Sequence, residues 1–210
     1  MKFENVYFVN GTAYAGKSTL VKNLAKKYDG IACEENYHDN YEGTLTPEEF
    51  PGLCYTRDLA DWHDFIRRTP DEYESWINTT SKECEKIELR MLEEIAKEPK
   101  PVFVDTNISI ETLREISNKD HVIIMLADPS VSVDLFFNRP DKEKQFLYRL
   151  IMEENDPPSA LENFRACLER INSWENYNKF LSSGFNVILR DENRTQEETA
   201  EIAEKLFRLK

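Results

Sequence analysis

Short apolar runs alternate with longer stretches in which apolar residues recur every three or four positions. The longer stretches predict amphipathic helices, and the short runs predict buried strands. The predicted strands are Val6–Val9, Gly30–Glu34, Val102–Asp105, Val122–Leu126 and Phe185–Leu189. Strands that alternate with helices in this way form βαβ units. The pattern therefore predicts an α/β, doubly wound fold with a parallel sheet covered on both faces.

Capping residues mark where three of the helices begin. Thr69–Glu72 supplies an N-cap, a proline at the first helical position and a glutamate at the third, so a helix is predicted over about 70–97. Asp156–Ser159 predicts the start of a long helix that reaches Leu181, and Thr195–Glu198 is a capping box for the final helix. Shorter helices are predicted near 58–67, 110–117, 131–138 and 145–153.

A loop with glycine near both ends joins the first strand to the first helix. Its residues match G-x-x-x-x-G-K-[ST], the phosphate-binding P-loop, in the strand–loop–helix context that the motif requires. Main-chain N–H groups of such a loop bind phosphates, Lys17 is suited to the outer phosphates, and the hydroxyl of Ser18 is suited to Mg²⁺. The sequence thus predicts a site for ATP and Mg²⁺ on the loop: Gly11, Thr12, Ala13, Tyr14, Ala15, Gly16, Lys17, Ser18 and Thr19.

Composition narrows the classes of partner. The chain has 210 residues, which suits one α/β domain, and 40% of them are hydrophobic. A net charge of −13 argues against a nucleic-acid partner. No apolar stretch is long enough to span a membrane and no signal-peptide pattern is present, so a cytoplasmic location is expected. The four cysteines form no C-x-x-C pair, which predicts reduced, packed thiols without structural zinc.

In the P-loop and in its order of elements, the chain resembles the small P-loop kinases of the nucleoside, nucleotide and shikimate kinase type. The resemblance covers nearly the whole chain but is specific only at the P-loop. It implies a three-layer sandwich with a five-stranded parallel sheet in the order 2-3-1-4-5, the P-loop NTPase fold. It also implies one kinase-like domain over 1–210, with an acceptor-binding insert at about 36–100 and a lid at about 139–150.

The resemblance gives roles to residues outside the loop. Asp105 closes the third strand and is expected to hold the Mg²⁺ shell or to assist the acceptor hydroxyl. Glu34 and Glu35 lie at the end of the second strand, where the related deoxynucleoside kinases place a base. Adjacent strand positions face opposite ways, so at most one of the two should face the site. Arg139 and Arg149 are the first candidates for lid cations that stabilise charge on the transferred phosphoryl group.

Further candidates bind the two substrates. Arg190 and Asn193 fall in the loop after the fifth strand, which contacts adenine in the relatives. Tyr37 and Arg57 lie in an aromatic-rich segment that is expected to bind the acceptor through rings and a guanidinium. Tyr14 departs from the small residue of many relatives, and would either cover the acceptor side or pack outward.

The function expected is an ATP-dependent kinase that transfers the γ-phosphate to a hydroxyl, or less readily a phosphate, of a small-molecule acceptor. A nucleoside, a nucleotide or a sugar-acid-like metabolite fits this class. The alternatives are an ATPase or GTPase switch and an interaction scaffold. A GTPase would carry N-K-x-D, of which Asn118–Asp120 is only a fragment. No nucleic-acid or membrane partner is expected, whereas a homodimer, the identity of the acceptor and the choice between ATP and GTP are left open.

Overall fold

The computed structural model describes residues 2–41, 43–138 and 142–209, and the chain divides into two compact units. The sheet unit comprises residues up to Gly43, Cys84–Ala127 and the part from Tyr177 onward. The helical unit comprises Thr44–Glu83 and Asp128–Asn176. Each unit is thus built from separate segments of the chain, so its packing depends on residues far apart in sequence. The expectation of one kinase-like domain stays a prediction.

The sheet unit is built on five parallel strands in the order β2-β3-β1-β4-β5, which confirms the predicted α/β class and strand order. In the register, Val6 of β1 lies opposite Val102 of β3, and Phe8 lies opposite Val122 of β4. Strand β1 therefore sits in the middle of the sheet. The strands are β1 (Val6–Gly11), β2 (Ile31–Cys33), β3 (Val102–Asp105), β4 (Val122–Leu126) and β5 (Asn186–Leu189).

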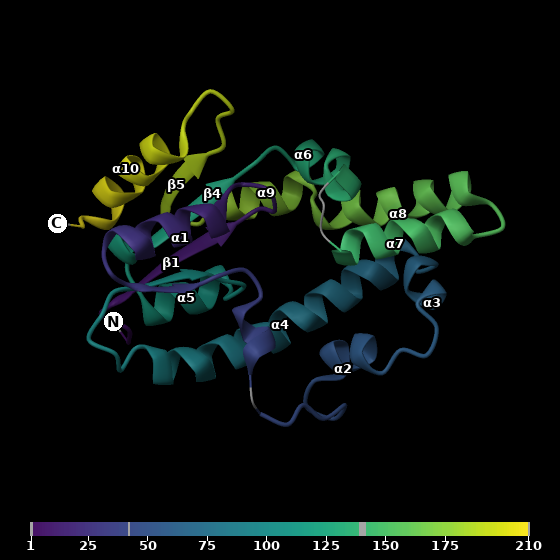
Figure 1. Cartoon of the computed structure of the whole chain (residues 1–210), viewed down its shortest axis with the longest axis horizontal. Helices are drawn as coiled ribbons and strands as arrows, with labels where there is room; N and C mark the ends of the chain where they lie inside the picture. Colours follow the sequence, from purple (N-terminus) through teal and green to yellow (C-terminus); the bar gives the residue numbers. More distant parts are fainter. Residues whose placement is uncertain (1, 42, 139–141, 210) are drawn as a thin grey trace. The chain divides into compact units, whose positions relative to one another are not determined.

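Helices cover both faces of this sheet. Successive strand residues point to opposite sides, so neighbouring residues pack against different helices. Phe8 packs with helices α4 and α5, whereas Val9 packs with α1 and α10 (Figure 1). Strands β3 and β4 are buried at every position, which explains why they read as continuous apolar runs. The helices are α1 (Lys17–Lys27), α4 (Pro70–Ile95), α5 (Ile110–Ile116) and α10 (Gln196–Phe207), with 3₁₀ turns η1 (Tyr37–Asn40) and η2 (Lys119–His121).

The helical unit has its own apolar core. Phe65, Tyr73, Ile151 and Phe164 are buried together, with several aromatic rings in edge-to-face contact. The unit includes the first part of α4 and the beginning of α9. Its other elements are α2 (Pro51–Arg57), α3 (His63–Ile66), α6 (Pro129–Asp134), η3 (Phe136–Asn138), α7 (Lys142–Glu153) and α8 (Pro157–Ile171), and α9 itself is Trp174–Leu181.

Two predicted helices differ from the structure in their extent. The helix expected from Pro157 to Leu181 breaks after Ile171, where the Asn172 side chain donates to the Leu168 carbonyl and Asn176 donates to the Ile171 carbonyl. Such local side-chain bonds compete with the helix ladder. The helix predicted near 58–67 is wrong in its extent, since α3 covers His63–Ile66 alone within that range, and α2 (Pro51–Arg57) was not predicted. The capping box of α10, by contrast, is confirmed.

None of the helices in the described part of the chain combines the length and the apolar character needed to cross a bilayer.

Candidate functional site

The loop between β1 and α1 has a constrained backbone. Gly11 and Gly16 have φ of 129° and 93°, and Tyr14 has φ of 62°, so three of its residues lie in the left-handed region. A Cβ on Gly11 would stand 1.9 Å from the Met125 carbonyl oxygen, which excludes any other residue there. This path brings the loop over the first turn of α1, whose leading N–H groups have no partner within the helix.

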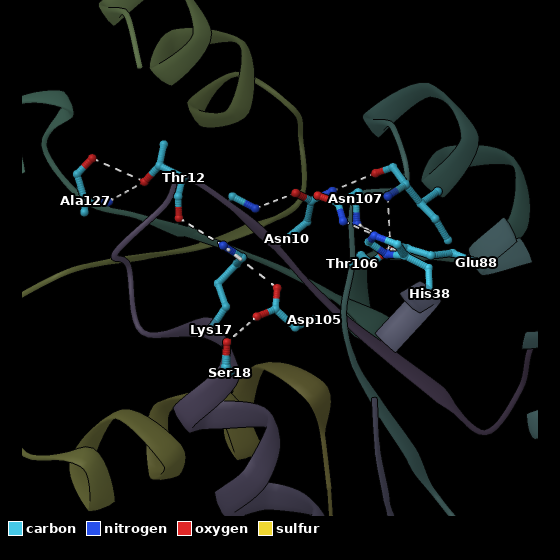
Figure 2. Close-up of polar contacts among 12 residues, drawn as sticks. Asn10, Thr12, Lys17, Ser18, His38, Glu88, Asp105, Thr106, Asn107 and Ala127 are labelled. Carbon is cyan, nitrogen blue, oxygen red and sulfur yellow. Dashed lines mark hydrogen bonds and ion pairs between the residues drawn. The ribbon is translucent and has the colours of Figure 1, made fainter. Parts of the chain in front are cut away.

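The base of the loop is fixed to the neighbouring strands. Thr12 donates its N–H to the Met125 carbonyl at 3.0 Å, and its hydroxyl accepts from the Ala127 N–H at 2.7 Å. The buried Asn10 side chain accepts from the Gly11 N–H at 2.5 Å and donates to the Ile108 carbonyl at 2.6 Å. These bonds hold the loop at the carboxyl end of the sheet (Figure 2).

Three side chains meet at the end of this loop. Ser18 donates its hydroxyl to Asp105 Oδ2 at 2.7 Å, and Lys17 Nζ lies 3.9 Å from Asp105 Oδ1. Lys17 also donates to the Thr12 carbonyl at 3.1 Å, so it bridges the loop and the carboxylate, as Figure 2 shows. The structure thus brings together the three residues that the sequence singled out first.

Asp105 is in an electrostatically strained position. Its side chain is 4% exposed, and this burial raises the pKa of the carboxyl, with further raising by the charges of Glu35 and Glu88. The Lys17 ammonium and the hydrogen bond from Ser18 lower the pKa of the same group. A carboxylate in such surroundings is stabilised by any additional cation that approaches it.

The donor set fits a hard cation that brings other ligands with it. The Ser18 hydroxyl and the Asp105 carboxylate offer oxygen atoms, which Mg²⁺ prefers. Within the described residues no group of three or more histidine, cysteine or acidic side chains is placed to hold a metal. A magnesium ion here would therefore depend on phosphate and water oxygens for most of its ligands.

The two candidate bases differ in their partners. Glu34 is exposed and forms an ion pair with Lys22 at 2.7 Å on α1. Glu35 is also exposed, yet its charge contributes to the raised pKa of Asp105. Glu35 is therefore the glutamate within electrostatic reach of the Asp105 site, while Glu34 is held by a lysine.

A cavity of about 400 Å³ lies beside the loop within the sheet unit. Tyr14, Thr19 and Arg190 are among the residues that line it, and Arg190 donates to the Tyr14 carbonyl at 2.7 Å. That bond supports the left-handed backbone at Tyr14, which faces this cavity. Asn193 is not among the lining residues, and its N–H is bonded to the Asp191 carboxylate instead. Of the two residues predicted in the loop after β5, Arg190 lines this cavity and Asn193 does not.

The remaining candidates are distributed among several environments. Arg149 is exposed on α7 in the helical unit, and Arg139 lies outside the described residues. Arg57 is exposed, where it pairs with Asp58 and donates to the Leu45 carbonyl at 2.9 Å. Tyr37 is 7% exposed in the core of the sheet unit, where burial raises its pKa. Its position suits packing more than ligand contact, and all four roles stay predictions.

The helical unit contains an arginine whose surroundings suit an anion better than those of Arg57. Arg68 stacks its guanidinium over the Tyr55 ring at 4.1 Å, with Phe65 and Trp76 also within 6 Å. Its buried Nη1 atom finds no hydrogen-bond partner in the described structure. Arg68 also lines a cavity of about 790 Å³ with Tyr55 and Trp76, so the guanidinium stands beside a space of ligand size.

Sequence reasoning missed Glu88, which is fully buried on α4. It accepts from the Thr106 hydroxyl at 2.6 Å, from the Asn107 side chain at 3.0 Å and from the Asn107 N–H at 3.1 Å, and it lies 3.2 Å from His38 (Figure 2). The signal was a glutamate among the apolar positions of α4, next to Ile87 and four residues before Leu92. This network fixes the two residues that follow Asp105.

Neither a protein-family model nor a curated protein sequence matches the chain.

Proposed function

We propose that this chain is an ATP-dependent small-molecule kinase with the P-loop NTPase fold, which transfers the γ-phosphate of ATP to a hydroxyl or phosphate of its acceptor. The observation that carries the proposal is the convergence of Lys17, Ser18 and Asp105 under a glycine-bounded loop, with Ser18 Oγ 2.7 Å from Asp105 Oδ2. The loop joins the central strand to a helix in a sheet of order 2-3-1-4-5, which agrees with the resemblance.

Each part of this site has a task in phosphoryl transfer. The N–H groups of the loop and of the first turn of α1 would bind the β- and γ-phosphates. Lys17 would exchange the Thr12 carbonyl for a phosphate oxygen. Magnesium bound with the nucleotide would neutralise charge on the transferring group, and Ser18 and Asp105 are the chain's oxygen ligands for it. The nucleobase would occupy the cavity lined by Tyr14 and Arg190.

The acceptor side of the proposal involves a base in the sheet unit, and the helical unit by itself contains an anion-binding candidate. Glu35 is the better candidate to orient the acceptor hydroxyl, since Glu34 is paired with Lys22. Within the helical unit, Arg68 is a better candidate than Arg57 to bind an anion, because it stands beside a cavity and has aromatic rings around it. An anion that also carries a ring suits the cavity beside Arg68, and nucleotides and sugar acids have both groups. A cytoplasmic location and lid roles for Arg139 and Arg149 belong to the same proposal.

The decisive experiment combines a variant with an acceptor panel. ATP consumption by the purified protein is measured with nucleosides, nucleotides and sugar acids, and we expect it to rise sharply with one of them. Lys17→Ala should lower this turnover by at least about a thousandfold while the circular dichroism spectrum stays unchanged. Lys22→Ala, on the exposed face of the same helix, is the matched control and should retain activity.

Two results would contradict the proposal in different ways. Unchanged turnover in Lys17→Ala would remove the loop from the chemistry altogether. Steady ATP or GTP hydrolysis that is indifferent to every acceptor would indicate a nucleotide-driven switch instead of a kinase.

The base is identified by a second pair of variants. Glu35→Gln should lower the turnover number by about a hundredfold, because general base assistance commonly contributes that much. Glu34→Gln removes an equal charge from the neighbouring position and should have little effect. Equal losses in the two variants would show that neither side chain acts as a specific base.

A further inference from the structure

Three side chains of the sheet unit form a series of contacts that phosphoryl transfer does not use. Glu88 Oε1 lies 3.2 Å from His38 Nδ1, and His38 Nε2 lies 3.3 Å from Cys84 Sγ. Cys84 and Glu88 are one turn apart on α4, and the imidazole from η1 reaches both. We propose that Cys84 is a nucleophilic thiol activated by His38, and that hydrogen peroxide oxidises it to a sulfenic acid.

The hydrogen bonds around Glu88 determine the direction of the proton. Thr106 and Asn107 both donate to Glu88, so its carboxylate acts only as an acceptor. His38 must then donate from Nδ1, which leaves Nε2 facing the sulfur to take the proton of the thiol. Burial lowers the pKa of His38, but the hydrogen bonds to Cys84 and Glu88 together raise it to about 10. Nucleophile, base and orienting carboxylate therefore occupy the positions that thiol activation needs.

The other cysteines provide a contrast within the same molecule. All four thiols are free, and Cys84 is 8% exposed, against 4% for Cys33, 2% for Cys54 and 1% for Cys167. Burial raises the pKa of Cys33 to about 12 and that of Cys167 to about 11, which keeps both protonated. Of these four cysteines, all within the described residues, Cys84 places its sulfur against a histidine, 3.3 Å from His38 Nε2. A small oxidant should therefore distinguish it from the rest.

Other titratable groups face the same contact. The exposed Asp39 places Oδ1 3.7 Å from His38 Nε2, and with Glu88 it stabilises the imidazolium. Tyr37, whose ring centroid lies 6.4 Å from that of His38, and Cys33 both stay neutral, because burial raises the pKa of each. The positive charge of the His38 imidazolium therefore stabilises a thiolate at Cys84. The negative carboxylates of Glu88 and Asp39 oppose that thiolate but stabilise the imidazolium.

The oxidation step balances without a further reagent. The Cys84 thiolate attacks one oxygen of hydrogen peroxide, a sulfur–oxygen bond forms, and the oxygen–oxygen bond breaks. The leaving hydroxide takes the proton of the His38 imidazolium and becomes water. Sulfur loses two electrons and the peroxide gains them, so the products are Cys84 sulfenic acid, water and neutral His38.

Site-resolved mass spectrometry of the intact folded protein tests this proposal. With hydrogen peroxide and dimedone, we expect a dimedone adduct at Cys84 and none at Cys33, Cys54 or Cys167. With iodoacetamide at pH 7, Cys84 should react about tenfold faster than Cys33, since the thiolate is the reactive form. An alkylation rate at Cys84 no higher than at Cys33 would overturn the proposal.

Two histidine variants test whether His38 activates Cys84 or whether Cys84 is merely more exposed than the other thiols. His38→Gln should slow alkylation of Cys84 at pH 7 by about tenfold, because the thiol loses its base. His63→Gln breaks a comparable contact, 2.6 Å from Glu154 in the helical unit, and should leave Cys84 unchanged. An unchanged rate in His38→Gln would refute activation by that residue.

The wild-type pH profile decides the matter if His38→Gln does not fold, which rapid labelling of all four cysteines would reveal. An alkylation rate that rises less between pH 7 and pH 9 at Cys84 than at Cys33 supports the proposal, and an equal or larger rise at Cys84 overturns it. None of these readouts requires ATP turnover, so the result is independent of the proposed kinase activity.

Discussion

Asp105 and Glu88 are buried carboxylates on either side of the segment that follows β3, and they differ in how fully they are satisfied. Glu88 accepts from Thr106 and Asn107 and contacts His38, with no exposed surface. Asp105 has one close hydrogen bond, from Ser18, and a lysine at 3.9 Å. A carboxylate whose oxygens all accept from protein donors fixes structure, whereas one with a single close donor retains the capacity to bind an incoming cation.

The largest effect should come from removing the saturated carboxylate. Glu88→Ala leaves His38 and the Thr106 hydroxyl buried without an acceptor, so the free energy of unfolding should fall by about 3–5 kcal/mol. Urea denaturation measures this value. Glu94→Ala, on the exposed side of the same helix, is the control and should change stability by less than about 0.5 kcal/mol. A small loss in Glu88→Ala would show that the buried network contributes little.

Asp105→Asn should give the opposite pattern. Loss of the negative charge next to Lys17 and Ser18 should lower ATP turnover by about a hundredfold. Burial raises the pKa of Asp105, so the folded protein disfavours the charged form at neutral pH, and the amide should leave the unfolding free energy unchanged or slightly higher. Turnover and urea denaturation are measured on the same sample. A stability loss as large as that of Glu88→Ala would abolish the distinction between the two carboxylates.

The contact between His38 and Glu88 should make the free energy of unfolding depend on pH, because His38 is protonated in the folded protein. Its pKa is raised from 6.5 to about 10 in the folded protein, so its stabilisation is complete below pH 6.5 and is lost as pH rises toward 10. Unfolding free energy should fall across that window, with a slope of at most about 1.4 kcal/mol per pH unit. His38→Gln should flatten the slope. An equally steep decline in the variant would assign the pH dependence to other groups.

The smallest effect is expected at the cavity beside the loop. Arg190→Ala removes the hydrogen bond to the Tyr14 carbonyl and one wall of the cavity, so KM for ATP should rise about three- to tenfold with little change in kcat. Arg208→Ala, whose side chain pairs with Asp120 at the end of α10, serves as the control. A fall in kcat with unchanged KM would place Arg190 in the chemical step instead.

Of the two carboxylates, Asp105 was predicted from the sequence and Glu88 was not, and the reasons are physical. Strand β3 is buried on both faces, so its apolar run and its terminal Asp105 were visible in the pattern, as was the sheet order through the resemblance. Lys17 and Ser18 were predicted because the loop motif defines their positions by spacing. These features depend on neighbours in sequence or on a regular repeat.

The missed features depend on contacts between distant residues. Glu88 meets His38 and Asn107 only after α4 has packed on the sheet, and no local spacing encodes that meeting. The same holds for Arg68, whose value as an anion-binding group rests on the surrounding rings and not on its neighbours in the chain. The break between α8 and α9 arose from asparagine side chains that bond to the backbone, which helix periodicity does not register.

The central place of β1 has a consequence for biosynthesis. The first strand that can pair with β1 is β3, which begins at Val102. A ribosome that adds ~5–20 residues per second needs about 5–20 s to synthesise the chain between these two strands, and β1 has no partner strand during that time. During that interval the segment Val6–Val9 emerges as an unpaired apolar β-former, the kind of stretch that chaperones bind and that aggregates nucleate upon. Overexpression at low temperature or with added holdase should therefore raise the yield of native protein.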